Sequence, residues 1–374
     1  MHDCSFAVSS LLPTLSENLF ADLDVERVTS KLQQNRTAKT NEAGEPIDDK
    51  QRSEQKIALW EELKILGFTR TISSIYLLTL LILFTHLQLN LLGRFFYLDS
   101  VHTFADQLDL SHSSSESSPT EPRVKAVSDE TERKYLTFSW YILNVGWKRC
   151  VEKVREAVRE VIGSMSLKEP LSFQKLEELI TEIRTKVDTT SILETSSQTA
   201  YPFVDCLMPP EGNEAEVIQG GGATLSDGVT ITEESEECTT AASGSTVEGE
   251  LQDLLNETRD FLESPDFQNL LSHSLTQSFS LLLSQLRPTF EITPKSPVLP
   301  PSPTSVQPEE SSITELPTPE MKDVPLAGVI PVFSRMGYGV LAGVGNGYLE
   351  ALADLPELKA FAVVVYTGWE DGGL

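Results

Sequence analysis

The feature that most constrains the fold is a long stretch without charge in the first third of the chain. Between Arg70 and Arg94 there is no Asp, Glu, Lys or Arg, and residues 75–84 are almost continuously apolar. About 20 apolar residues are enough for a helix to cross a bilayer. Polar side chains interrupt both flanks, however, so the continuous apolar block is shorter and falls in the range typical of a buried core helix. We therefore expect the central helix of a large bundle, with a transmembrane helix as the alternative.

The rest of the chain also carries a strong helical signal and little strand signal. Apolar side chains recur at helical spacing, with polar and charged side chains on the other faces, in 147–162, 176–187, 251–262 and 267–286. Segments 11–32 and 57–66 are amphipathic in the same way. Ser264 is a typical helix N-cap, followed by Pro265 at the first helical position and Asp266 near the positive end of the helix dipole. The pattern predicts an all-α fold, a large elongated helical bundle.

Four stretches break this pattern, and we expect them to be long disordered loops inserted into a single domain, 1–374. They are the polar stretch 37–54, the Ser-rich 109–128, 209–249 with its acidic run, and the Pro- and Ser-rich 288–320. None contains enough apolar side chains to fold alone. The acidic run could bind a basic partner, although a solvated loop is the favoured interpretation.

The charge balance and the scattered Cys and His residues argue against several functions. The chain has 29 Lys and Arg against 56 Asp and Glu, a net charge of −27. A general nucleic-acid binder needs clustered positive charge, so no nucleic-acid partner is expected. No Cys or His has the spacing of a metal site, and no nucleophile elbow, P-loop or kinase signature is present. We therefore expect no metal, no cofactor and no enzymatic activity, although an active site assembled from distant residues would escape this search.

A glycine-rich stretch near the C-terminus superficially looks like a dinucleotide-binding motif. Residues 337–343 read GYGVLAG. A dinucleotide site needs these glycines between a strand and a helix, and the sequence supplies no such unit. Close helix packing at small residues is the interpretation that we favour.

Trp60 stands out as a candidate binding residue. Helical spacing places Lys56, Trp60 and Leu63 on one face, just before the uncharged stretch. From the pattern alone, a tryptophan here is more often an anchor in the core. The alternative is an exposed hot spot for a partner helix, flanked by a positive charge.

Several strings of residues resemble the peroxin-3 family, and they occur in order along most of the chain. They are 12–15 (LPTL), 59–65 (LWEELKI), 68–70 (FTR), 88–93 (QLNLLG), 97–99 (YLD), 163–168 (GSMSLK) and 255–267 (LNETRDFLESPDF). The loops and the glycine-rich C-terminal stretch match least.

The resemblance implies an elongated all-helical bundle on the cytosolic side of the peroxisomal membrane. It implies docking of peroxin-19, the soluble receptor that delivers peroxisomal membrane proteins, which would be indirect cargo. The N-terminal amphipathic helix of peroxin-19 would enter a groove centred on Trp60, so the hot-spot interpretation now leads. Lys56 and Leu63 share that face, and Leu32 is a further candidate. The uncharged segment 71–93 would belong to the folded domain.

The resemblance also bears on membrane attachment. Family members carry an N-terminal anchoring segment ahead of the part with which this chain begins, so the usual anchor is expected to be lacking here. Attachment to the peroxisomal membrane is then implied by kinship. An alternative function is a general membrane tether that recruits inheritance or turnover factors through the loops 209–249 and 288–320.

Overall fold

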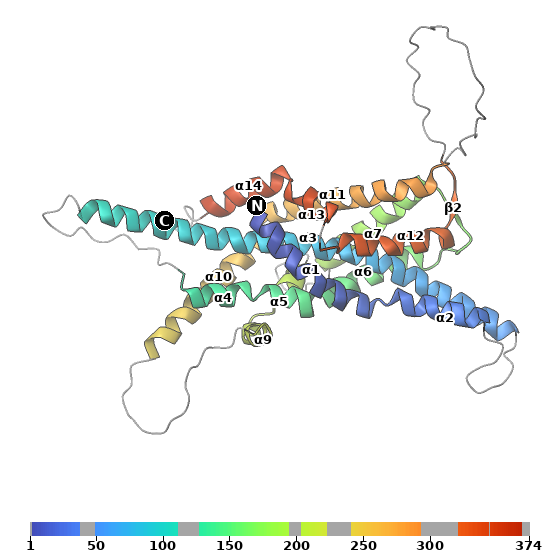
Figure 1. The fold of residues 1–374 in the computed structure, drawn as a ribbon, viewed down its shortest axis with the longest axis horizontal. Helices are drawn as coiled ribbons and strands as arrows, with labels where there is room; N and C mark the ends of the chain where they lie inside the picture. The colour runs from blue at the N-terminus through green and yellow to red at the C-terminus, as the bar shows by residue number, and fades with distance from the viewer. Residues whose placement is uncertain are drawn as a thin grey trace, which may run out of the picture.

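The computed structural model describes residues 2–37, 49–110, 127–193, 203–222, 241–292, 321–343 and 345–368. Within these ranges the chain is almost entirely helical, which confirms the predicted all-α class. The molecule is elongated, and one helix, α3 (Asp49–Leu110), runs along most of its length (Figure 1).

The other elements are mostly helices that surround α3. In chain order they are α1 (His2–Asp22), α2 (Val25–Thr37), α4 (Asp129–Leu136), α5 (Ser139–Tyr141), the π-helix η1 (Ile142–Gly146), α6 (Trp147–Ile162), α7 (Phe173–Leu193), α8 (Val204–Leu207), α9 (Glu214–Gly220), α10 (Ala241–Glu263), α11 (Pro265–Phe290), α12 (Leu326–Val340), α13 (Gly347–Ala353) and α14 (Pro356–Thr367). Two short strands, β1 (Pro170–Leu171) and β2 (Val324–Pro325), pair antiparallel with Pro170 opposite Pro325. This pair ties the turn between α6 and α7 to the start of α12.

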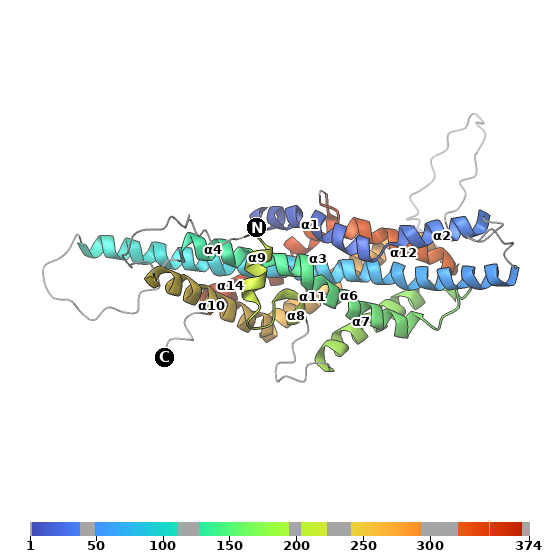
Figure 2. The same ribbon diagram turned by 90° about the horizontal axis from the view of Figure 1, so that it is seen from below.

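The uncharged stretch forms the buried middle of α3. Every residue from 67 to 88 is buried, and α1, α2, α6, α11, α12 and α14 all pack on this helix. Figure 2 shows α1, α2 and α12 along one side of α3, with α6 and α7 on the other. By length and composition the helix could cross a membrane, but 89% of its most apolar window is buried inside the protein. The arrangement agrees with the prediction of a core helix.

Several polar side chains within this buried stretch donate hydrogen bonds to backbone carbonyls. Ser74 and Thr85 donate to the carbonyls one turn earlier in α3, at 2.8 Å each. Gln88 Nε2 donates to the carbonyl of Tyr135 at 2.9 Å. These bonds explain how polar residues can interrupt the apolar block without opening the core to water.

The two arginines that border the stretch are also buried and paired. Arg70 binds Glu26 of α2, and Arg94 binds Glu257 of α10. Each also donates to a backbone carbonyl in the C-terminal part of the chain, at Ser334 and Val365 respectively. Each end of the buried span therefore carries a charge that another helix neutralises.

The predicted helical stripes are the buried faces of their helices. In α6 the predicted positions Trp147, Val151, Val154, Val158, Val161 and Ile162 are all buried. At the start of α11 the Ser264 side chain accepts a hydrogen bond from the Phe267 N–H, and Pro265 is the first helical residue. The amphipathic segment 11–32 is divided between α1 and α2, which are separated at residues 23–24.

The predicted loops lie partly outside the described residues, and at several of the edges that the structure describes, helix replaces the predicted loop. Residues 49–54 and 109–110 belong to the ends of α3. α9 and residues 241–249 of α10 fall within the predicted loop 209–249, and α11 continues through Pro288 to Phe290. At the start of α3 the helix carries polar side chains all round, so apolar content does not distinguish it from a loop. At the end of α11 the helix continues because Phe290 is buried in the core.

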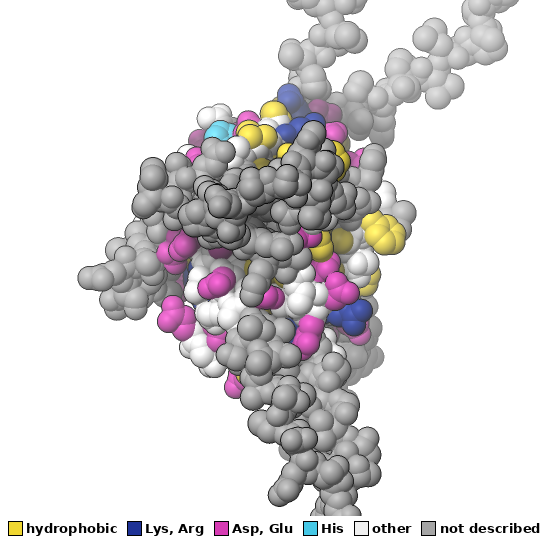
Figure 3. All heavy atoms as spheres, turned by 90° about the vertical axis from the view of Figure 1, so that its left-hand side faces the viewer, with side chains coloured by type: hydrophobic (Ala, Val, Ile, Leu, Met, Phe, Trp, Pro, Cys, Tyr) yellow, Lys and Arg dark blue, Asp and Glu magenta, His cyan; other side chains and the backbone are white. Residues whose placement is uncertain are grey.

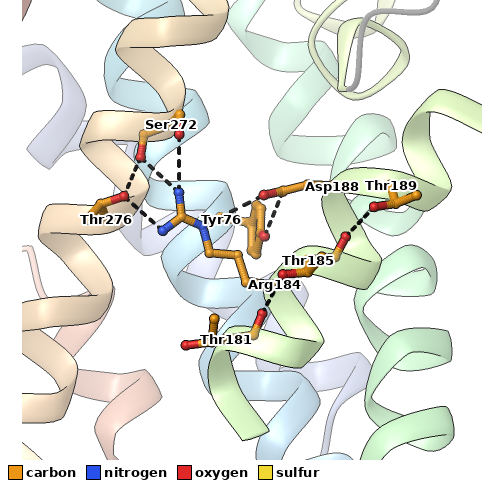
Figure 4. A network of polar contacts seen from close by, with 8 residues as sticks. All are labelled: Tyr76, Thr181, Arg184, Thr185, Asp188, Thr189, Ser272 and Thr276. Carbon is orange, nitrogen blue, oxygen red and sulfur yellow. Dashed lines mark hydrogen bonds and ion pairs between the residues drawn. The ribbon is translucent and has the colours of Figure 1, made fainter. Parts of the chain in front are cut away.

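A polar network joins α7 to α3 and α11 (Figure 4). The buried Tyr76 hydroxyl of α3 donates to Asp188 Oδ1 of α7 at 3.0 Å. Arg184 of α7 donates to the Thr276 hydroxyl at 2.8 Å and to the Ser272 carbonyl at 2.9 Å, both in α11. The buried side chains of α7 are those of its single apolar stripe. The network adds polar contacts to α3 and α11 and so helps to fix the position of α7.

Candidate functional site

A groove of about 700 Å³ lies among α2, the N-terminal part of α3, and α12. These three helices run together toward the right-hand end of Figure 1. The lining residues are Val25, Glu26, Thr29, Ser30, Leu32 and Gln33 of α2, Lys56, Trp60, Leu63 and Arg70 of α3, and Ile330, Pro331, Ser334, Arg335 and Tyr338 of α12. All four residues selected from the sequence therefore line one groove.

The four residues differ in how much of each is exposed. Leu63 is buried at 4% exposure, Trp60 and Leu32 are half-buried against the core, and Lys56 is exposed. Trp60 thus combines the two interpretations made from the sequence, because one part of the ring packs on the core and the side chain also lines the groove. Leu32 faces the groove from α2, 28 positions before Trp60.

The wall formed by α12 is held close to α3 by small residues. A Cβ added to Gly67 would lie 3.3 Å from Ser334 Cβ, and one added to Gly337 would lie 3.4 Å from Thr71 Oγ1. The Thr71 hydroxyl donates to the Phe333 carbonyl at 2.7 Å. Gly337 lies inside a helix that packs on another helix, as expected from the interpretation of residues 337–343 as packing rather than a nucleotide site.

The Arg70 guanidinium forms part of the groove floor. Its side chain is 1% exposed, and Nη1 donates to both carboxylate oxygens of Glu26, at 2.9 and 3.1 Å. The guanidinium carbon lies 4.9 Å from the centre of the Phe20 ring and 4.3 Å from that of Tyr338. The Tyr338 hydroxyl donates to Glu26 Oε1 at 2.9 Å.

The carboxylate of Glu26 is kept ionised by these neighbours. Partial burial alone would raise its pKa, but the hydrogen bonds from Arg70 and Tyr338 outweigh that effect and hold the pKa below the ordinary value. The groove floor therefore contains a charged pair and is not a purely apolar surface.

Sequence reasoning missed Arg70, Glu26, Arg335 and Tyr338. Three of the four come from α2 and α12, whose approach to α3 depends on the tertiary fold. Arg70 did carry a signal, because an arginine at the edge of a buried helix needs a partner with opposite charge. Nothing in the sequence indicated which carboxylate would supply it.

The groove differs in charge from the protein as a whole. Its lining contains three cations, Lys56, Arg70 and Arg335, and one carboxylate, Glu26, in a chain with a net charge of −27. At the opposite end of the molecule, acidic side chains are scattered over the described surface (Figure 3). Within the described ranges, no group of three or more His, Cys, Asp or Glu side chains could hold a metal ion. The groove is suited to binding an acidic, partly apolar ligand.

Comparison with known proteins gives a consistent relationship. A family model described as Peroxin-3 matches residues 1–53 and 40–368. Peroxisomal biogenesis factor 3 of Rattus norvegicus is 28% identical over 363 residues, covering 97% of this chain and 80% of that protein. Peroxisomal biogenesis factor 3 of Yarrowia lipolytica is 28% identical over 406 residues, covering 98% and 86%. Peroxisomal membrane protein PEX3 of Komagataella phaffii is 30% identical over 215 residues, covering 50% and 46%.

Proposed function

The chain belongs to the peroxin-3 family, and on this premise we propose that it is the docking receptor for peroxin-19 in the insertion of peroxisomal membrane proteins. A role in peroxisome biogenesis follows from family membership, since the relatives are named for it. We further propose that the chain is associated with the peroxisomal membrane, as the name of the Komagataella relative states for that protein. Its bulk would face the cytosol, where soluble peroxin-19 can reach the groove.

The observation that carries the docking proposal is that Leu32, Lys56, Trp60 and Leu63 line the same groove. Leu63 and Trp60 follow one face of α3, whereas Leu32 comes from the separate helix α2. Two helices thus bring together an aromatic ring, two aliphatic side chains and a cation. This combination is typical of a groove that receives the apolar face of an amphipathic helix.

The proposed mechanism is binding without chemistry. The apolar face of the peroxin-19 helix would pack on Trp60, Leu63 and Leu32, which removes apolar surface from water. Lys56 at the rim would favour acidic side chains on the partner and speed the encounter. Since tryptophans in such positions dominate binding energy, we expect Trp60 to contribute about 2–4 kcal/mol.

Calorimetric titration with the N-terminal helix of peroxin-19 tests the proposal. The Trp60→Ala variant should bind about 30- to 1,000-fold more weakly than the wild type. Trp140→Ala is a matched control, because Trp140 is also half-buried but lies in α5, outside the groove. Unchanged affinity in Trp60→Ala, or an equal loss in both variants, would refute docking at this groove.

The alternative function as a tether stays a prediction. Recruitment through 209–249 and 288–320 depends mainly on residues outside the described ranges. No described feature of the structure favours it over docking.

A further inference from the structure

Tyr338 on α12 is an exposed aromatic residue in the groove. It lies beside Arg70, at what we call the inner end of the groove, whereas Trp60 and Lys56 lie at the outer end. Tyr338 is 44% exposed and is flanked by Gly337 and Gly339. Gly337 lies against α3, whereas a Cβ added to Gly339 would meet nothing within 4 Å. The tyrosine ring therefore stands between two positions without side chains, and both of its neighbours in sequence leave it accessible.

Despite this exposure, the Tyr338 ring is held from several sides. The Phe20 and Tyr338 rings make a T-shaped contact at a centroid distance of 4.5 Å, and the Arg70 guanidinium lies over the Tyr338 ring at 4.3 Å. Its hydroxyl donates to Glu26, which is itself fixed by Arg70. Fixing a side chain before binding reduces the entropy lost on binding, which is typical of residues that anchor a partner.

Arg335, one turn before Tyr338, adds a positive charge to the same end of the groove. Its side chain is exposed, and it forms no ion pair within the described part of the chain. Arg70 is neutralised by Glu26, so Arg335 is the cation of this end that remains available to a ligand. An aromatic ring beside an available cation repeats the pairing of Trp60 with Lys56 at the outer end.

We propose that Tyr338 and Arg335 form a second anchor point for the partner helix, at the opposite end of the groove from Trp60 and Lys56. This inference rests on the proposed docking function and specifies the chemistry of the partner. Tyr338 packs on an apolar side chain, and Arg335 pairs with a carboxylate. Arg70 is a positioning residue, because its side chain is only 1% exposed and its guanidinium lies over the Tyr338 ring.

The separation of the two anchor points defines the partner further. The Arg70 guanidinium lies over the Tyr338 ring, so the position of Arg70 on α3 marks the second anchor point. Trp60 and Arg70 are ten residues apart on α3, which corresponds to a rise of about 15 Å. The fitting ligand is therefore an amphipathic helix with two apolar anchors about three turns apart, each beside an acidic residue. A helix with one anchor would leave one end of the groove empty.

Titration with the same peroxin-19 helix measures the second anchor. Tyr338→Ala should weaken binding about 10- to 30-fold. Arg335→Glu should weaken it about 10-fold and should be rescued by a helix in which one particular carboxylate is replaced by lysine. Tyr97→Ala is the matched control, since Tyr97 is 61% exposed on α3 but lies outside the groove, and its affinity should equal that of the wild type.

The outcomes separate this inference from the docking proposal. Wild-type affinity in both Tyr338→Ala and Arg335→Glu, together with loss in Trp60→Ala, would overturn the second anchor and leave docking intact. Failure of the wild-type chain to bind the helix would overturn both. If Tyr338→Ala does not fold, the exposed Arg335→Glu variant and its charge-reversed helix decide the question, and absence of rescue by every single carboxylate-to-lysine change counts against the inference.

Discussion

The structure contains two clusters built from the same three chemical groups, an arginine, a carboxylate and a tyrosine, in opposite arrangements. At the groove the arginine is buried, and the carboxylate and tyrosine are exposed. Between α7 and α3 the tyrosine is buried, and the arginine and carboxylate reach the surface. The members are Arg70, Glu26 and Tyr338 in the groove cluster, and Arg184, Asp188 and Tyr76 in the α7 cluster.

The comparison shows how burial assigns different roles to the same groups. In the α7 cluster the ring of Tyr76 is part of the core, and the charges at the surface fix α7 to the bundle (Figure 4). In the groove cluster the buried charge of Arg70 holds an aromatic ring at the surface, where a partner can contact it. The first cluster is a joint between helices, and the second also shapes a binding surface.

Truncating the two tyrosines gives the largest expected difference. Tyr76→Ala removes a fully buried ring and should lower the free energy of unfolding by about 3–5 kcal/mol. Tyr338→Ala removes a 44% exposed ring and should cost no more than about 1 kcal/mol. Urea denaturation followed by circular dichroism measures both. Equal losses would mean that Tyr338 is a structural residue and would end the comparison.

Replacing the two arginines should reverse that order, with the larger loss of stability in the groove cluster and the smaller one in the α7 cluster. Arg70→Met leaves Glu26 without its ion-pair partner and the Ser334 carbonyl without a donor, and we expect a loss of about 2–3 kcal/mol in the free energy of unfolding. Arg184→Met removes the hydrogen bonds to Thr276 and Ser272, but water can replace the lost donor there, and we expect a loss of about 1 kcal/mol in the free energy of unfolding.

Peptide affinity distinguishes the two arginine variants independently of stability. Arg70→Met should weaken binding of the partner helix, because the Tyr338 ring loses the guanidinium that lies over it. Arg184→Met should leave binding unchanged, because Arg184 does not line the groove. Weaker binding in Arg184→Met would show that the α7 joint also controls the groove.

The core of the fold could be predicted from sequence because buried positions there are occupied by apolar residues in a regular pattern. The absence of charge between Arg70 and Arg94 identified the central helix, and 3.6-residue periodicity identified the faces of α6 and α11 that pack around the core. The same periodicity placed Lys56, Trp60 and Leu63 on one face.

The opposite wall of the groove could not be predicted in the same way. Tyr338 lies 278 positions after Trp60, and its contact with Arg70 depends on the path of the whole chain between them. The glycines beside Tyr338 predicted close packing, but only Gly337 packs on another helix, and the sequence did not indicate that this helix is α3. The partner of Arg70 was equally hidden, because any of 56 acidic residues could have supplied the charge.

The smallest expected effect is a difference in the sign of the pH dependence of stability. Hydrogen bonds from Arg70 and Tyr338 hold the pKa of Glu26 below its ordinary value despite partial burial. Stability from this group is present above the unfolded-state pKa of about 4.3 and is lost as the pH falls through the lower folded-state pKa. Burial raises the pKa of Asp188, despite the hydrogen bond from Tyr76 and the charge of Arg184. The folded state therefore binds this proton first, and acidification favours folding at this site.

Urea denaturation of Glu26→Gln and Asp188→Asn between pH 6 and pH 3.5 measures these signs against the wild type. The advantage of the wild type over Glu26→Gln should shrink as the pH falls, because the wild type then loses its charged pair. The stability of the wild type relative to Asp188→Asn should instead rise over the same interval. Each change should be about 0.2–1 kcal/mol, as for other partly exposed pairs. Slopes of the same sign would show that both carboxylates lie in similar environments, and the two clusters would then differ only in which side chain is buried.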